Sequence, residues 1–367
     1  MEIYFINWLF FSLLSIGEKY NLFKNHISKK LLSFVIIILI LFIGLRINVG
    51  CDWITYKEIF KVISNENIFK LNDGGRIEIG YALINKFIST IGGNIYLSNT
   101  IMATLFIVPL TISFKKLKKP FLSFLIAYPY LIIVIGMGPT RQAAAMSLIA
   151  LSSFYINKNF KTFAIINIFA LSLHLSSAFT SIIVLFSSKN LKESIKNNWI
   201  LIVLVLLISI SIFYIYSYDH LYIKFYAYLF KTRFKDAKSH IIIWAMNIFP
   251  YIILFLNKNI NYKRINIFEV HKKVFIALCI LPFFSLINTT LTYRLLISFI
   301  PYSIFLLTDL ADKKLFIPIK FNFYIYNFYS IILLSVWLNF SKHAYCWIPY
   351  RINYMTLLDY KIQQLFQ

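Results

Sequence analysis

Long uncharged stretches alternate with short basic segments along the whole chain. A helix that spans a bilayer needs about 20 mostly apolar residues. A strand outside a closed barrel cannot satisfy its backbone groups in lipid, and barrel strands would show short alternating segments. The continuous runs therefore predict an all-α polytopic membrane protein. The uncharged runs cover residues 87–114, 120–140, 162–188, 199–218, 274–293 and 321–341.

Further apolar segments near the N-terminus and in the second half raise the expected total to about 11–12 transmembrane helices. The amphipathic segment 79–92 contains Lys86 and is expected to be an interfacial or re-entrant helix. Residues 1–367 are interpreted as a single polytopic membrane domain. The expected helices are 3–17, 31–45, 95–114, 121–138, 141–156, 162–173, 175–187, 199–217, 241–257, 274–290, 293–310 and 322–340.

The run 162–188 is long for one span and has a polar interruption around His174. Splitting it into two short helices places both termini and the segments 46–94, 217–240 and 341–367 on the outer side. The cytoplasmic segments then carry the larger share of Lys and Arg, as the positive-inside rule requires. A single span would invert the orientation of every later segment and remove most of this charge bias. The sequence therefore favours the split and leaves the alternative open.

Composition supports a lipid environment. The chain is 59% hydrophobic and 14% charged, with a mean hydropathy of +0.72, whereas globular chains carry about 25% charged residues. The net charge of +23 is interpreted as lysine anchoring of helix ends rather than nucleic-acid binding. The three cysteines show no metal-site spacing. Cys51 and Cys346 both fall on the outer side, where a disulfide between them is permitted but not required.

The arginines are distributed unlike the lysines, because all except Arg264 fall in outer segments. The planar guanidinium group binds phosphate through two parallel hydrogen bonds, which lysine cannot do. We therefore expect Arg46, Arg141 and Arg294 to bind a diphosphate, with help from Arg351. Chance, or retention of lysine inside, would give the same bias, and Arg141 could simply extend toward the headgroups.

Three side chains are candidates for a general base. Asp52 and Glu78 lie in the first outer segment, and either could accept a proton from a sugar hydroxyl. Ordinary ion pairs in a solvated loop would explain them equally well. His174 is ionisable within an apolar run, a position that is often functional, although a lone histidine can also serve in helix packing.

Aromatic residues near the membrane boundary give a weaker signal. Trp53, Tyr56, Trp347 and Tyr350 could stack on sugar rings. For any one of them, anchoring at the lipid interface is the simpler explanation.

Several short motifs occur in order along the chain. They are Gly44-Leu45-Arg46 with Val49-Gly50-x-Asp52-Trp53-x-x-Tyr56, Glu78-x-Gly80-Tyr81, Arg141-Gln142, His174-x-Ser176-Ser177-Ala178, Arg294 with Tyr302, and Trp347-x-Pro349-Tyr350. Taken in order, these motifs resemble the EpsG-like group of Wzy-type polymerases, which build O-antigen, capsule and exopolysaccharide. The resemblance extends over nearly the whole chain, although Cys51 stands where a small hydroxyl residue is expected.

The resemblance implies a GT-C-like architecture and a multi-pass location in the bacterial inner membrane. It also implies transfer of a growing glycan from undecaprenyl diphosphate to an incoming lipid-linked repeat at the periplasmic face. We expect no cofactor and no metal, because no acidic cluster is evident in the sequence. Whether a second membrane protein regulates chain length stays open. The alternatives are an O-antigen ligase, a glycosyltransferase using a lipid-phosphate sugar, or a flippase for lipid-linked oligosaccharides. The flippase fits less well because the chain has only 10 glycines and no internal repeat.

Overall fold

The computed structural model describes residues 1–65, 77–189, 191–197, 239–257, 265–311, 313 and 319–353. Within these ranges the chain forms helices and no strand, which confirms the all-α fold class. The expected helix at 199–217 lies outside the described residues, as do Arg76, Arg233 and Arg264. The described helices are α1 (Glu2–Lys19), α2 (Asn25–Gly44), α3 (Trp53–Asn65), α4 (Ile79–Thr90), α5 (Ile95–Phe114), α6 (Pro120–Ala127), η2 (Tyr128–Ile135), α7 (Thr140–Ser152), α8 (Phe160–Leu173), α9 (Ser177–Leu185), α10 (Leu191–Asn197), α13 (Ser239–Leu256), α14 (Phe268–Phe284), α15 (Thr289–Ile297), α16 (Ile300–Leu310), α17 (Ile319–Phe340) and the 3-10 turn η5 (Ala344–Cys346).

Four helices in the described ranges are long and apolar enough to cross a membrane. They are α2, α5, α13 and the 323–340 part of α17. The pair α15 and α16 would add a fifth span, bent by 45° at its break. These helices confirm the membrane character of the chain. The total of about 11–12 spans and the GT-C-like resemblance stay predictions.

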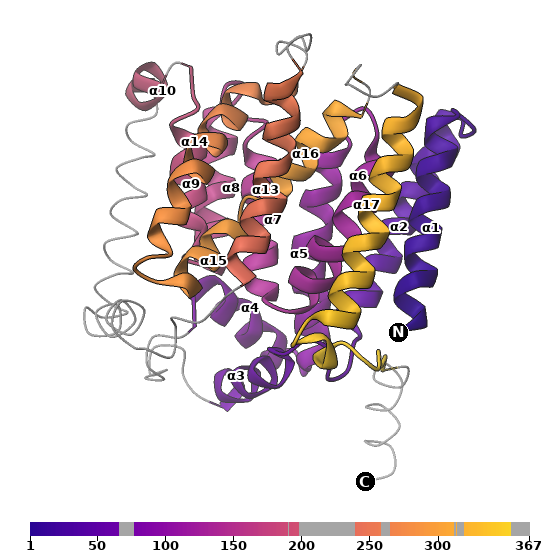
Figure 1. Cartoon of the computed structure of the whole chain (residues 1–367). Coiled ribbons are helices and arrows are strands. Elements are labelled where there is room, and N and C mark those ends of the chain that lie inside the picture. Colours follow the sequence, from indigo (N-terminus) through magenta and orange to yellow (C-terminus); the bar gives the residue numbers. More distant parts are fainter. Residues whose placement is uncertain are drawn as a thin grey trace.

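The helices stand side by side in a bundle, while α3 and α4 lie at its lower end (Figure 1). The helix at 79–92 was expected from its amphipathic pattern, and α4 confirms it. Its Lys86 donates to the carbonyl oxygens of Ile63 and Ser64, at 3.2 and 3.1 Å, and so caps the C-terminal end of α3. The two short helices therefore form one unit beneath the bundle.

A side chain of α1 caps the N-terminus of α6. The Glu18 carboxylate of α1 accepts from the backbone N–H groups of Phe121 and Leu122, at 3.2 and 3.0 Å. A negative charge at a helix N-terminus satisfies free N–H groups and interacts favourably with the helix dipole. Helix α6 then continues into η2, a π-helix that begins at Tyr128 and contains Pro129. Such wide turns often occur at functional sites.

The run 162–188 is divided as expected, with α8 and α9 separated at His174. Two other segments differ from expectation. Residues 53–65 form α3, although they were expected to be loop. The single helix expected at 293–310 is broken between α15 and α16, with Pro301 in the first turn of α16, where proline is well tolerated.

Candidate functional site

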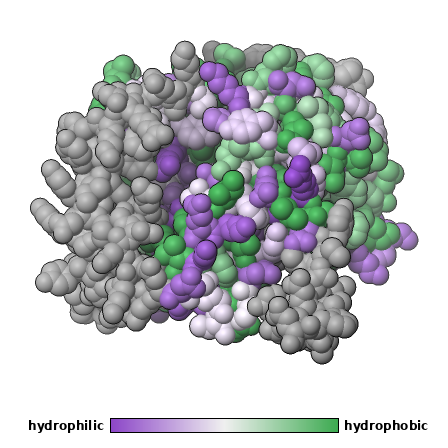
Figure 2. Space-filling view, turned by 90° about the horizontal axis from the view of Figure 1, so that it is seen from below, coloured by the Kyte–Doolittle hydropathy of each residue, from purple (hydrophilic) through white to green (hydrophobic). Residues whose placement is uncertain are grey.

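A cavity of about 440 Å³ opens among the elements at the lower end of the bundle. Seen from this end, hydrophilic side chains gather over the face (Figure 2). The sequence-predicted residues that line it come from five separate segments of the chain. They are Asp52, Tyr56, Arg141, His174, Arg294 and Trp347.

Glu78, at the N-cap of α4, links two of these residues. One carboxylate oxygen, Oε2, accepts from Arg141 Nη1, and the other, Oε1, lies 3.0 Å from His174 Nδ1. All three side chains are largely buried, with 14–16% of each exposed. Charge-assisted hydrogen bonds of this kind are stronger than neutral ones. Glu78 therefore fixes the orientation of both an arginine and a histidine at the cavity.

Arg141 is also held by two aromatic rings. Its guanidinium carbon lies 5.6 Å from the centre of the Tyr56 ring and 5.2 Å from that of Tyr81. The residue sits in the first turn of α7, and the following Ala143 and Ala144 are fully buried. Small residues allow neighbouring helices to approach closely in a membrane protein. The cationic group thus sits on a closely packed helix and lines the cavity.

Arg294 reaches the same cavity from α15. The Gln142 side chain donates to the carbonyl oxygen of Arg294 at 2.8 Å, which ties the last turn of α15 to the start of α7. Asn288 caps the other end of α15 through the N–H of Leu291, at 2.8 Å. The two arginines are therefore presented by helices that are directly hydrogen-bonded to each other.

His174 occupies the break between α8 and α9, where its backbone is extended. Its carbonyl oxygen accepts from the Ser177 hydroxyl, which fixes the turn into α9. Its Nδ1 faces Glu78, so the other ring nitrogen, Nε2, is not used in this contact. The imidazole ring lines the cavity. The polar interruption thus places a carboxylate-oriented histidine at the site.

Arg46 does not line the cavity, contrary to its expected diphosphate contact. It is fully buried, and its guanidinium group donates to the backbone carbonyl oxygens of Ile43, Val49 and Met137. Burial lowers the pKa of Arg46 to about 10, so the group is still charged at neutral pH. The residue joins the end of α2 to the turn that precedes α7.

Replacing Arg46 with methionine should destabilise the protein by about 3 kcal/mol or more, because net contributions of charged hydrogen bonds are about 1.5–3 kcal/mol each. The measurement is thermal unfolding of the purified protein in detergent. Arg351→Met is the matched control, since Arg351 is exposed. Equal unfolding temperatures for both variants would contradict the structural role of Arg46.

A disulfide joins Cys51 to Cys346, the pair that the sequence left open, with 5.1 Å between their Cα atoms. Beside it, the N–H of Gly50 donates to the carbonyl oxygen of Cys346 at 2.8 Å. Gly50 has a φ of +93°, and a Cβ there would collide with the carbonyl oxygen of Met137. Only glycine fits at this position, where the two backbone segments approach closely. The disulfide thus closes the rim of the cavity between the first loop and the C-terminal segment.

Reduction of this disulfide should lower stability by about 2–4 kcal/mol, because the bond closes a long loop in the unfolded chain. Thermal unfolding with and without reductant measures the effect. The Cys51→Ser/Cys346→Ser variant should resemble the reduced protein and no longer respond to reductant. Cys279→Ser is the control, because Cys279 is an exposed free cysteine. An unchanged unfolding temperature of the reduced wild-type protein would refute the prediction.

The other expected site residues have structural contacts. The indole N–H of Trp53 donates to the carbonyl oxygen of Arg46 at 3.1 Å, and that of Trp347 donates to Ile133 at 3.0 Å. The Tyr350 hydroxyl donates to the Phe42 carbonyl oxygen at 2.8 Å. Trp347 also lines the cavity, whereas Trp53, Tyr350 and Arg351 do not line it.

Tyr130, Trp337 and His343 also line the cavity but were not expected there. Tyr130 lies in η2, whose widened turn has no recognisable sequence pattern. Trp337 lies within the long apolar run of α17, and its ring packs edge-on against that of Trp347 at 4.8 Å. For Tyr130 and Trp337, the only sign of a site in the sequence was a polar aromatic residue within an apolar span.

Comparison with known families agrees with this arrangement of motifs. The EpsG family model matches residues 29–352, from α2 to the C-terminal segment at the cavity rim. The chain belongs to the EpsG family. This is the family of Wzy-like polymerases, so the EpsG chain has a polysaccharide-polymerase-like function and multi-pass membrane character. No curated protein and no solved structure matches it.

Proposed function

We propose that this EpsG-family protein joins undecaprenyl-diphosphate-linked repeat units into a polysaccharide at the periplasmic face of the bacterial inner membrane. The observation that carries the proposal is one cavity lined by Arg141, Arg294 and His174, with Glu78 bound to two of them. Family membership supplies the reaction class. The donor, the acceptor and the side of the membrane are part of the proposal.

In the proposed reaction a hydroxyl of the incoming unit attacks the anomeric carbon of the growing chain. The bond from that carbon to the diphosphate breaks, and undecaprenyl diphosphate leaves with the bonding electrons. Arg141 and Arg294 bind the diphosphate and stabilise the negative charge that develops on it, which is usually a large contribution to catalysis. Two substrates anchored at the same membrane depth also gain from proximity.

The hydroxyl proton passes to Nε2 of His174. Glu78 accepts a hydrogen bond from Nδ1, which selects the required tautomer and stabilises the imidazolium ion that forms. Asp52 is the competing base, because it is exposed and lines the same cavity. Tyr56 and Trp347 offer aromatic surface for the sugars beside the reacting groups.

The position of the disulfide supports the periplasmic assignment. Cys51 lines the cavity, and disulfides persist in oxidising compartments such as the periplasm. An active site beside this bond therefore fits the outer face.

Deletion of the gene in its own bacterium tests the reaction. The proposal predicts that long glycans disappear and that single repeat units accumulate on lipid, with both effects reversed by the wild-type gene. Accumulation of long lipid-linked chains would instead indicate a ligase. An unchanged distribution of glycan lengths would refute a polymerase.

A further inference from the structure

The cavity has two chemically different sides. Arg141, Arg294 and His174 belong to α7, α15 and the turn between α8 and α9. Trp337 and His343 come from α17 and from the segment that follows it. Helices α15 and α17 lie on different sides of the bundle (Figure 1). The proposed reaction uses the charged side and assigns no role to Trp337.

Trp337 is held in place by the C-terminal segment. Its ring centre lies 4.8 Å from that of Trp347, at an angle of 86° between the planes. Trp347 in turn donates from its indole N–H to the carbonyl oxygen of Ile133 in η2, and its own carbonyl oxygen accepts from the Tyr4 hydroxyl at 2.8 Å. Trp347 is 4% exposed, whereas Trp337 is half-buried. Trp337 therefore presents a fixed aromatic surface to the cavity.

Two tyrosine hydroxyls meet in the same cavity. Tyr130 of η2 and Tyr293 of α15 both line it, and their hydroxyl oxygens are 3.4 Å apart. This separation is long for an O–H···O hydrogen bond, whose usual range is about 2.5–3.0 Å. Each hydroxyl has one donor and two acceptor positions. The pair can therefore bind a further hydroxyl group that enters the cavity.

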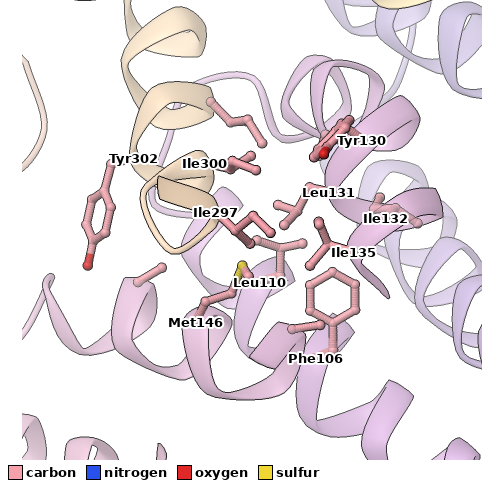
Figure 3. Packing of buried hydrophobic residues seen from close by; sticks show 14 of the residues in the cluster. Phe106, Leu110, Tyr130, Leu131, Ile132, Ile135, Met146, Ile297, Ile300 and Tyr302 are labelled. Atoms are coloured by element: carbon pink, nitrogen blue, oxygen red, sulfur yellow. The ribbon is translucent and has the colours of Figure 1, made fainter. Parts of the chain in front are cut away.

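The inner boundary of the cavity is apolar. Ile135 and Ile297 line it and are fully buried. Figure 3 shows both of them within the core cluster that includes Phe106 and Leu110. A polar group placed against this boundary loses its water, which costs free energy unless a hydrogen bond replaces it. Tyr130, labelled in the same view, can supply such a bond through its hydroxyl.

An aromatic face together with hydroxyl partners matches the two kinds of surface on a sugar. A pyranose ring carries apolar C–H groups on its faces and hydroxyls around its edge. The face of an indole ring is the negative part of its quadrupole and attracts C–H groups. A cavity of about 440 Å³ also falls within the usual range of small-ligand sites, about 300–1,000 Å³. A sugar and the diphosphate bound to Arg141 and Arg294 can therefore share it.

We propose that Trp337, Tyr130 and Tyr293 form a binding subsite for a sugar ring of the lipid-linked repeat. The inference rests on the proposed function and adds which residues hold the glycan while the arginines hold the diphosphate. Trp337 supplies the stacking surface. The tyrosine hydroxyls give specificity, because a site that hydrogen-bonds a substrate hydroxyl rejects an analogue that lacks it.

Binding of two lipids to the purified full-length protein tests the subsite. The probes are undecaprenyl diphosphate without sugar and lipid-linked repeats isolated from the bacterium that carries the gene. Trp337→Leu should weaken binding of the repeat about tenfold, because contacts with two or more ring C–H groups are lost. It should leave binding of the sugar-free lipid unchanged. Trp337→Phe keeps an aromatic face and should retain most of the affinity.

Tyr130→Phe and Tyr293→Phe repeat the test with little change of shape. Each removes one hydroxyl and should weaken binding of the repeat about three- to tenfold, with no effect on the sugar-free lipid. Trp244→Leu is the matched control for Trp337→Leu. Trp244 is half-buried in α13, donates to the carbonyl oxygen of Leu278 and lies outside the cavity lining. This variant should bind both lipids like the wild-type protein.

Elongation assays assign the ring to one substrate. A preformed lipid-linked polymer serves as donor and a single repeat as acceptor, and each is varied in turn. In Trp337→Leu only the substrate whose ring stacks on the indole should show a raised KM. A rise in neither KM would overturn the proposal.

Two binding results would also overturn the subsite. One is equal weakening of both lipids in Trp337→Leu, which would indicate a structural effect. The other is unchanged binding of the repeat in all three of Trp337→Leu, Tyr130→Phe and Tyr293→Phe. Binding requires no glycan transfer. If the variants bind as expected but the wild-type protein elongates no glycan, the proposed function alone fails. If the wild-type protein elongates glycan and the variants bind the repeat normally, the subsite alone fails.

Discussion

Replacing Arg141 with lysine is expected to reduce polymerisation at least about 100-fold, the loss that follows removal of one preorganised donor to a developing anion. Arg141 uses Nη1 to bind Glu78 while its planar group lies against Tyr56 and Tyr81. A lysine has one compact ammonium group, so it cannot keep the Glu78 bond and also present a planar pair of donors to the diphosphate. Initial rates of glycan elongation on lipid-linked repeats measure the effect.

Arg351→Lys is the control for this substitution, because Arg351 is exposed and lies outside the cavity lining. It should elongate glycan at the wild-type rate. Arg294→Lys should behave like Arg141→Lys. If both cavity variants keep full activity, bidentate binding of the diphosphate is refuted.

Replacing His174 with alanine should lower the elongation rate by about 10²–10⁴, the usual contribution of a positioned general base. Glu78→Gln should cause a loss of similar size. An amide has only one oxygen, so its NH₂ group would face either Arg141 Nη1 or His174 Nδ1 as a second donor. Both substitutions should slow the chemical step more than they weaken substrate binding.

His343→Ala gives the matched comparison, because His343 lines the cavity but is exposed. We expect it to retain activity within about tenfold, since no developing charge depends on it. Asp52→Asn separates the two candidate bases. A large loss in Asp52→Asn together with full activity in His174→Ala would transfer the role of base to Asp52.

Apolar run length was enough to predict the long helices. Runs that contain no charge produced α5 and α13, and the polar interruption at His174 marked the turn between α8 and α9. Helix α3 was missed because Lys57, Glu58 and Lys61 interrupt the apolar pattern, so run length does not reveal it. Its buried Trp53, Tyr56 and Ile63 follow helical spacing, and that periodicity was the available signal.

The site was predictable only in part, because composition does not show what a guanidinium group contacts. Arg46 and Arg141 both lie at a helix end near the membrane boundary. After Arg46, positive φ angles at Asn48 and Gly50 turn the chain, and the Arg46 side chain is enclosed by carbonyl oxygens. Glu78 and His174 are 96 residues apart in sequence. Their pairing depends on where α4 and α8 meet, which no local pattern encodes.

Elongation by the purified protein is the most direct test of the proposal that this cavity transfers glycan between lipid diphosphates. Lipid-linked repeats extracted from the deletion strain would be supplied as both donor and acceptor, and product length read on a gel. The account predicts a ladder of whole repeats with wild-type protein and with Arg351→Lys, and only single units with Arg141→Lys. A ladder from Arg141→Lys as long as that of the wild type, or no ladder from folded wild-type protein, would contradict it.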